Sequence, residues 1–228
     1  MIFQFHLTLI RHGETDENVQ SIIQGCMDTK LNQTGRNQAK SLASSSKFNP
    51  CDFNIIYSSD LSRAYDTCRI LTEDRADIIC DKLLRERNFG NLEGSPISKL
   101  SSLAAASGVS IVDYTAGGGE SLADVAKRAE QFIENRLLKE VQSGQQVLLV
   151  SHGGLIRQMI IYLKKFGNFS QVHSKKALHV PPNTSQSKFK IFYDHSKIVK
   201  VECIEMHDIS HLSGEAKQKA LEQHQINP

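Results

Sequence analysis

The sequence predicts an α/β fold with a mostly parallel central sheet and an antiparallel edge strand or hairpin. Two observations support this prediction. Short apolar runs alternate with amphipathic stretches, and two of these runs end at a histidine followed by glycine, at His12 and His152. In an open α/β sheet, ligands bind beyond the carboxyl ends of the strands. A site at that edge of the sheet is therefore expected.

The first third of the chain has a strand, helix, strand rhythm. Residues 2–10 form a strand by their apolar pattern, and residues 53–57 form a second, buried strand after Pro50. Between them, Thr34 is the expected N-cap of a helix. Apolar residues at helical spacing from 61 to 71 place Arg63 in the first turn of the next helix, and residues 78–84 return as a strand.

The remaining elements extend this pattern to the end of the chain. Residues 85–119 look irregular apart from a helical stretch near 97–106, and we expect them to form a flap over the site. Residues 122–141 predict a long amphipathic helix, residues 146–150 a strand and residues 155–166 another helix. Residues 187–193 and 198–205, joined by Asp194-His195-Ser196, predict an edge hairpin. About fifteen final residues look polar and loosely held.

Length and charge limit the classes of function. The 228 residues suit a single domain spanning 1–228. The 27 basic and 25 acidic residues are spread along the chain, so a nucleic-acid partner is not expected. The chain shows no leader pattern and no apolar stretch of membrane-spanning length. We therefore expect a cytoplasmic protein without a membrane partner, as a monomer or weak homo-oligomer.

Cysteines and metal-binding patterns give no sign of a metal site. The five cysteines are scattered, which predicts reduced thiols that mostly serve packing. The sequence has no HExxH motif and no clustered set of carboxylates and histidines. We therefore expect neither a metal nor another cofactor.

Basic side chains near the predicted strand ends point to phosphate chemistry. Arg11 lies beside His12, Arg63 begins a helix, and Gly153 begins another helix after His152. Guanidinium groups and helix N-termini both favour phosphate oxygens. Such donors neutralise a transferring phosphoryl group without a metal, which leaves His12 to act as the nucleophile.

The same scheme requires a carboxyl group that gives a proton to the leaving oxygen and later takes one from water. Glu86 is the candidate, because it directly follows an apolar strand candidate in Leu84-Arg85-Glu86-Arg87. Taken alone, a Glu between two arginines is more often a solvated surface residue. Both interpretations of Glu86 stay open at this point.

Four motifs in order resemble those of the histidine phosphatase superfamily, which has the phosphoglycerate mutase-like fold. They are Arg11-His12-Gly13-Glu14-Thr15, Ser59-Asp60-Leu61-Ser62-Arg63-Ala64, Leu84-Arg85-Glu86-Arg87 and Ser151-His152-Gly153. The resemblance covers nearly the whole chain and implies a three-layer α/β/α sandwich. It also implies that His12 becomes phosphorylated, that Glu86 donates a proton, and that Arg11, Arg63 and His152 bind the phosphoryl group.

Within this superfamily the chain resembles the phosphatase branch, at residues 23–25, 28, 31 and 34–35. Residues 89–94, 118–122, 182–184 and 208–212 resemble TIGAR-type fructose-2,6-bisphosphatases in particular. Vertebrate TIGAR-type enzymes carry a long insertion before the strand that leads to the second histidine, whereas residues 142–145 here simply turn. By the same resemblance Asn18, Gln24, Gly25 and Asn183 lie around the substrate.

The resemblance predicts a phosphatase that hydrolyses a small phosphomonoester or sugar bisphosphate, with fructose 2,6-bisphosphate as the leading candidate. Two other enzymes are alternatives: a phosphoglycerate mutase, and a broad-specificity phosphatase acting on 2,3-bisphosphoglycerate or similar esters. The mutase branch usually carries Trp, which this chain lacks. A pseudoenzyme that binds partners through its phosphate pocket is the non-enzymatic alternative.

Overall fold

The computed structural model describes residues 1–195 and 197–226, and a sheet of six strands forms its centre. In sequence order the strands are β1 (Phe3–Arg11), β2 (Ile55–Ser58), β3 (Ile78–Cys80), β4 (Gln146–Ser151), β5 (Gln186–Asp194) and β6 (Lys197–Asp208). Their order across the sheet is β3-β2-β4-β1-β5-β6. The first four are parallel, and β5 pairs antiparallel with β1 and with β6. The predicted mostly parallel sheet with an edge hairpin is confirmed, while Ser196 of its turn lies outside the described residues.

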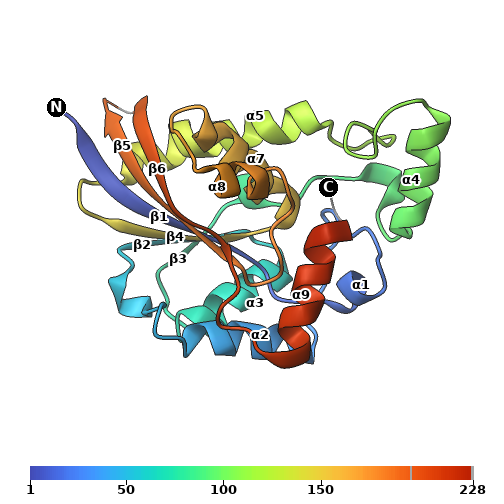
Figure 1. Ribbon diagram of the computed structural model, residues 1–228, viewed down its shortest axis with the longest axis horizontal. Coiled ribbons are helices and arrows are strands. Elements are labelled where there is room, and N and C mark those ends of the chain that lie inside the picture. Colours follow the sequence, from blue (N-terminus) through green and yellow to red (C-terminus); the bar gives the residue numbers. More distant parts are fainter. Residues whose placement is uncertain (196, 227–228) are drawn as a thin grey trace.

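Helices cover both faces of this sheet and make the predicted three layers (Figure 1). One face carries α2 (Gln33–Ala43) and α3 (Ser62–Leu71), and the other carries α5 (Leu122–Phe132), α7 (Gly153–Lys164) and α8 (Gln171–Lys176). A π-helical stretch (Ile133–Leu137) and α6 (Leu138–Glu140) continue α5. Beyond the carboxyl ends of β1 and β4 lie α1 (Asp16–Val19), α4 (Ile97–Ala106) and α9 (Gly214–Ile226). Short 3-10 turns span Pro50–Asp52, Lys82–Leu84 and Gly90–Leu92.

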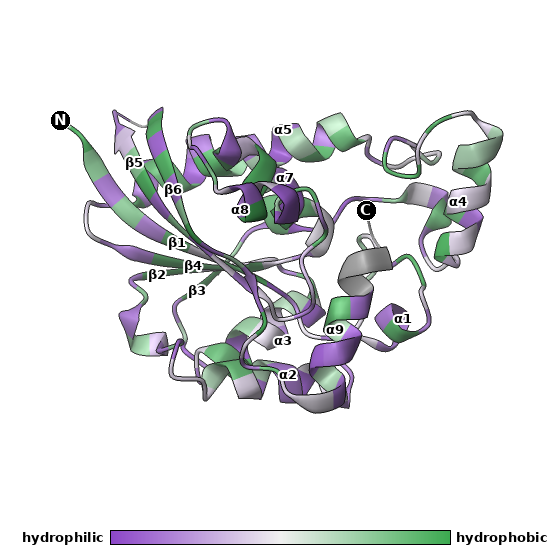
Figure 2. Ribbon diagram, viewed as in Figure 1, coloured by the Kyte–Doolittle hydropathy of each residue, from purple (hydrophilic) through white to green (hydrophobic). Residues whose placement is uncertain are grey.

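Alternating side chains of the strands build a separate core on each face. Along β4, Val147 and Leu149 pack with α5 and α7, whereas Leu148 and Val150 pack with α2 and α3. The alternation of hydrophobic and hydrophilic residues is visible along β1 in Figure 2. Burial of these apolar side chains at about 25 cal/mol per Å² is the main force that holds the three layers together. Among the described residues, no helix is both long and apolar enough to cross a membrane.

Three local expectations were wrong. The N-cap of α2 is Asn32 rather than Thr34, because the Asn32 side chain accepts from the Gly35 amide at 2.8 Å. The strand expected at 78–84 ends at Cys80, and Asp81 caps a 3-10 turn instead. The polar tail forms α9, which is held by Ala220 in a small cluster with Ile209 and Leu212.

Residues 88–119 project beyond the sheet around α4 and have a small core of their own. Leu92, Leu100 and Ala116 bury their side chains against Ile23. Main-chain bonds join the same two segments, because the Ile23 amide donates to the Ser95 carbonyl at 2.9 Å. The irregular region predicted by the sequence is therefore attached to the loop that follows α1.

Candidate active site

The two predicted strand-end histidines lie side by side at the carboxyl edge of the sheet. His12 directly follows β1, and His152 follows β4 as the N-cap of α7. Because β1 and β4 are parallel neighbours that pair Arg11 with Ser151, the next residue of each strand reaches the same place. The centroids of the two imidazole rings are 5.2 Å apart. Sheet pairing thus brings together residues that are 140 positions apart in the sequence.

The ring of His12 is held by its own loop. Its Nδ1 lies 2.7 Å from the carbonyl oxygen of Gly13, so Nδ1 carries the proton and donates it to that oxygen. The Gly13 amide donates to Thr67 Oγ1 at 3.0 Å. A β-carbon at Gly13 would lie 2.5 Å from the Gly35 carbonyl oxygen, so this position requires glycine. The other ring nitrogen, Nε2, therefore keeps its lone pair for an incoming electrophile.

The ring of His152 is fixed from a different strand. Its Nε2 lies 2.8 Å from the hydroxyl of Ser59, which follows β2, and neither residue is exposed to solvent. The Ser59 oxygen also accepts the Leu61 amide at 3.3 Å, so its own proton is free to point at His152 Nε2. In the tautomer in which Ser59 donates to Nε2, the imidazole carries its own proton on Nδ1.

Arg11 and Arg63 both donate to main-chain carbonyls, and each still has an Nε atom without a hydrogen-bond partner in the described part of the chain. Arg63 is only 1% exposed, and its Nη atoms donate to the carbonyls of Gly25 and Met27 at 2.7 Å each. Arg11 Nη1 donates to the Pro181 carbonyl at 2.8 Å. Among the described residues, both Nε atoms and His152 Nδ1 are buried side-chain nitrogens without a partner. Buried donors are nearly always satisfied, so these three indicate the place of an anion.

Arg11, His12, Arg63 and His152 form a cluster that we call the phosphate pocket. Burial and like charge govern the ionisation of its side chains. Desolvation holds the pKa values of His12 and His152 well below the ordinary value of 6.5, and the charges of Arg63 and Arg11 add to the effect. Burial also lowers the pKa of Arg11 to about 10, although the nearby Glu86 opposes the shift. The pocket thus holds two cationic guanidinium groups and two neutral imidazoles, a combination that favours a phosphoryl group.

Glu86 is not the solvated surface residue that its position between two arginines suggests. Its carboxylate accepts the amides of Gly154 at 2.9 Å and Leu155 at 3.2 Å, in the first turn of α7, and its neighbour Arg87 at 2.8 Å. These main-chain bonds fix the position of the carboxyl group at the start of α7. A side chain at Gly154 would come within 2.5 Å of Glu86 Oε1, so the close approach depends on glycine.

The other predicted residues surround the pocket and support its catalytic groups. Asn183 Nδ2 donates to the His12 carbonyl at 2.9 Å and to Asn18 Oδ1 at 3.3 Å. Gly25, at a positive φ of 51°, offers its carbonyl to Arg63. Gln24 Oε1 accepts the hydroxyl of Thr29 at 2.5 Å. Gly153 packs beneath Val180, where a β-carbon would lie 2.5 Å from Val180 Cγ1. Their direct contact with a substrate stays a prediction.

Sequence reasoning missed the groups that hold the site through long-range hydrogen bonds. Ser59 was named only as the first residue of a motif, without a role of its own, although it contacts the ring of His152. Thr67 holds the amide of Gly13, and the guanidinium of Arg128 reaches the main chain around Glu86. Arg128 sits on the polar side of an amphipathic helix, where a solvated role is the ordinary expectation.

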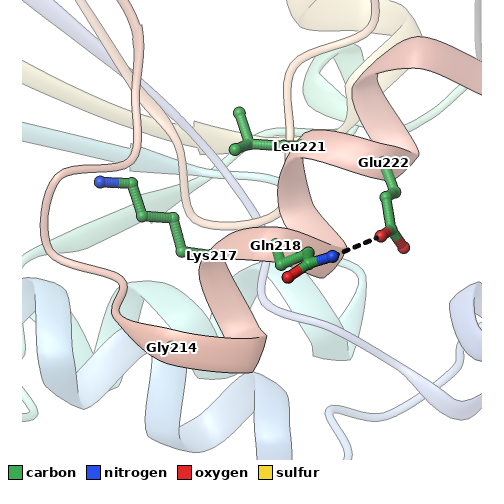
Figure 3. A pocket seen from close by; sticks show the side chains of 5 residues that line it. All are labelled: Gly214, Lys217, Gln218, Leu221 and Glu222. Carbon is green, nitrogen blue, oxygen red and sulfur yellow. Dashed lines mark hydrogen bonds between the residues drawn. The ribbon is translucent and has the colours of Figure 1, made fainter.

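Surface hollows elsewhere lack this chemistry. One lies along α9 and is lined by Gly214, Lys217, Gln218, Leu221 and Glu222, with a hydrogen bond of 3.3 Å between Gln218 and Glu222 (Figure 3). Another, beside the end of α7 and β6, has lysines such as Lys164 and Lys200 on its rim. Neither contains the predicted nucleophile or its partners. Among the residues whose side chains the structure describes, no group of three or more His, Cys, Asp or Glu is placed to hold a metal ion.

Comparison with known proteins is consistent with this geometry. The model of the histidine phosphatase superfamily (branch 1) matches residues 7–204. The fructose-2,6-bisphosphatase TIGAR of Xenopus tropicalis is 32% identical, covering 92% of this chain and 95% of its own. Phosphoglycerate mutase-like protein 4 of Arabidopsis thaliana is 29% identical, with 90% and 86% covered.

Solved structures give the same result. A mycobacterial glucosyl-3-phosphoglycerate phosphatase in complex with VO3 has a TM-score of 0.71 and 31% identity, with 89% of this chain and 98% of that chain covered. A phosphoglycerate mutase from Bacillus anthracis has a TM-score of 0.75 and 25% identity, with 92% and 95% covered. The chain belongs to branch 1 of the histidine phosphatase superfamily.

Proposed function

We propose that this chain is a metal-independent phosphatase that transfers the phosphoryl group of a small phosphorylated metabolite to His12 and then to water. The superfamily consists of phosphatases and mutases, so a phosphoryl-transfer enzyme is the general expectation. The observation that carries the proposal is the set of three buried nitrogens on Arg11, Arg63 and His152 that lack a partner among the described residues. The two arginines are close enough to lower the pKa of His12, and the His152 ring centroid lies 5.2 Å from that of His12.

In the first half-reaction, His12 Nε2 forms a bond to phosphorus while the bond from phosphorus to the leaving oxygen breaks. The Gly13 carbonyl supports this attack, because it fixes the proton of His12 on Nδ1. Arg11 and Arg63 neutralise the non-bridging oxygens, and His152 donates from Nδ1. Fixed donors of this kind need no reorganisation as the charge moves.

Glu86 completes the proton balance. It gives its proton to the leaving oxygen as the ester bond breaks, so the product departs as an alcohol. In the second half-reaction a water molecule attacks phosphorus, its proton passes to Glu86, and the bond to His12 Nε2 breaks. The amides of Gly154 and Leu155 hold the carboxyl group in one place for both steps.

Around this centre, Asn18, Gln24, Gly25, Gly153 and Asn183 are proposed to contact the substrate as well as the catalytic groups. Residues 85–119 are proposed to cover the site as a flap, since their small core packs on Ile23 beside Gly25. The whole chain, 1–228, is then one catalytic domain. These elements recognise the part of the substrate that lies beyond the phosphoryl group.

Fructose 2,6-bisphosphate is the first substrate to test, because the TIGAR enzyme of Xenopus tropicalis is similar over nearly its full length. The alternative with direct support is a phosphoglycerate mutase, since similar proteins carry that name. A mutase has to keep its phosphohistidine from water until the phosphoryl group is passed on. A broad-specificity phosphatase and a catalytically silent binding protein are the remaining alternatives.

A kinetic panel tests the proposal. We compare kcat/KM for fructose 2,6-bisphosphate, fructose 1,6-bisphosphate, 2,3-bisphosphoglycerate and phosphoglycolate, with and without EDTA, because specificity is a ratio of these constants. Phosphate release that EDTA leaves unchanged and that His12→Ala abolishes is the expected result. Formation of 2-phosphoglycerate from 3-phosphoglycerate faster than phosphate release would establish the mutase instead. Full activity in His12→Ala would overturn the proposal.

A further inference from the structure

The chain segment that carries Glu86 has no regular secondary structure of its own. It leaves the 3-10 turn Lys82–Leu84 and runs to the turn at Gly90–Leu92. The pairing that fixes His12 and His152 therefore does not extend to Glu86. Its main chain is instead bound by a side chain from α5.

That side chain is Arg128, which binds the main chain just before Glu86 and at Glu86 itself. Its Nη1 donates to the carbonyls of Leu83 at 2.8 Å and Arg85 at 2.7 Å. Its Nη2 donates to the carbonyl of Glu86 itself at 3.2 Å. A single guanidinium thus contacts three carbonyls within four consecutive residues.

Glu120 completes this arrangement from the residue that follows the irregular region 88–119. Arg128 donates to its carboxylate twice, from Nε to Oε1 at 2.9 Å and from Nη2 to Oε2 at 2.8 Å. The same carboxylate accepts the amide of Asn88 at 2.9 Å, and the Glu120 amide donates to the Asn88 carbonyl at 2.8 Å. The segment is therefore anchored before Glu86 by Arg128 and after it by Glu120.

The chemistry of this anchor is specific to arginine. A guanidinium has five N–H donors in a rigid plane, and all five of Arg128 are engaged in these contacts. A lysine has three donors on one atom and cannot span the same set of acceptors. The side chain of Arg128 is 15% exposed and that of Glu120 is 25% exposed, so solvent screens the pair only in part.

We propose that Arg128, together with Glu120, is a positioning residue for proton transfer by Glu86. This inference rests on the proposed function, in which Glu86 protonates the leaving oxygen. The amides of α7 hold the carboxylate, and Arg128 holds the main chain from which it extends. Because displacement of a catalytic group by about 1 Å can cost on the order of 10²-fold in rate, loss of the anchor slows proton transfer without removing the acid.

A series of substituted phenyl phosphates distinguishes this role from a general structural one. p-Nitrophenol leaves readily without a proton, whereas phenol and alkyl alcohols depend on the acid. We expect Glu86→Gln to lower kcat/KM for phenyl phosphate by about 10²-fold and for p-nitrophenyl phosphate by only a few-fold. Arg128→Met is expected to show the same dependence on the leaving group, with a loss of about tenfold for phenyl phosphate. The inhibition constant of vanadate stays unchanged, because the phosphate pocket is intact.

A matched control is available on the same run of helix. Arg136 is 46% exposed and pairs with the carboxylates of Asp81 and Glu140 rather than with the carbonyls of residues 83–86, so Arg136→Met is expected to leave the series unchanged. A double variant adds a stricter test. If Arg128 acts through Glu86, Arg128→Met has little further effect in the Glu86→Gln background, since residues that act as a unit are not additive.

The outcomes separate this inference from the function on which it rests. In one outcome, the loss in Glu86→Gln depends steeply on the leaving group, but Arg128→Met loses the same activity for all leaving groups or loses none. That outcome would overturn the role of Arg128 alone. If the loss of kcat/KM in Glu86→Gln is the same for every leaving group, Glu86 is not the acid, and this inference fails with it. The proposed chemistry at His12 would remain. Where Arg128→Met does not fold, Arg128→Lys and Glu120→Gln carry the same test with smaller expected losses.

Discussion

The phosphate pocket and the segment that carries Glu86 are built in different ways. In the pocket, sheet pairing and a helix start fix Arg11, His12, Arg63 and His152, and each position follows from regular structure. Residues 85–120 depend instead on long cationic side chains that bind carbonyl groups. We therefore expect that the two halves of the proposed chemistry can be perturbed separately. Changes in the pocket are expected to affect every substrate equally, and changes in the segment to depend on the leaving group or on the rest of the substrate.

The largest expected effect in this comparison belongs to Arg63. Replacement by Met removes a buried cation from the pocket, and we expect kcat/KM to fall by about 10²- to 10³-fold for all phosphate esters. Arg69, an exposed arginine on the same helix, provides the control as Arg69→Met. Steady-state kinetics with phenyl and p-nitrophenyl phosphate measure the effect. A loss confined to one of the two esters would contradict the common role of the pocket.

Arg87 tests the other region. Its guanidinium donates to the carbonyls of Val112, Tyr114 and Glu120 at 2.8, 2.6 and 2.9 Å, and it lies over the ring of Phe89. Arg87→Met leaves these half-buried carbonyls without their donor, at up to about 1 kcal/mol for each, because water can reach them in part. Hydrogen exchange is therefore expected to accelerate within residues 110–120 and to stay slow in β1 and β4. Equal acceleration in both regions would show that they do not open independently.

Ser59→Ala is expected to have a smaller effect, about tenfold on kcat/KM for all esters, because one buried hydrogen bond to His152 is lost. Ser59→Thr keeps a hydroxyl and serves as the control. The ¹⁵N chemical shifts of the His152 ring report its tautomer directly. An unchanged ring spectrum in Ser59→Ala would mean that the hydroxyl does not set the position of the proton.

The dependence of stability on pH gives the smallest effect. The folded pKa values of His12 and His152 are held below 6.5, so the unfolded chain binds more protons as the pH falls below that value. The contribution of these two histidines to the free energy of unfolding is therefore fully present above pH 6.5 and is lost as the pH falls towards 5. His211, whose pKa burial lowers to about 4, acts in the same direction. We expect Tm to fall by a few degrees over this range, and less with inorganic phosphate bound. A rise in Tm on acidification would contradict this assignment.

Much of the fold followed from local patterns, because the apolar strands and amphipathic helices bury a core on each face of the sheet. The errors arose where distant contacts decide. Asn32 rather than Thr34 caps α2, and its side chain also donates to Glu14 at 2.9 Å, a contact made only in the folded protein. The polar sequence of α9 gave little sign of a helix, since its anchor Ala220 packs on residues 209 and 212.

The residues of the candidate site also differ in how far local sequence patterns could predict them. His12 and His152 were predictable because they follow apolar strands, and Arg63 because it begins a helix. The environment of Glu86 was not predictable, since its partners Gly154 and Leu155 lie about 70 residues away and offer only main-chain amides. Arg128 has the sequence pattern of any solvated helix face, and its role depends on where the irregular segment passes.

The central claim is that His12 carries the phosphoryl group during turnover, and trapping that intermediate tests it most directly. The protein is mixed with a ³²P-labelled substrate selected by the kinetic panel, quenched in base within milliseconds and digested for mass spectrometry. The account predicts acid-labile, base-stable phosphate on the peptide containing His12, which is absent in His12→Ala and forms at least as fast as phosphate is released. Turnover without label on His12, or label on another residue at the rate of turnover, would contradict it.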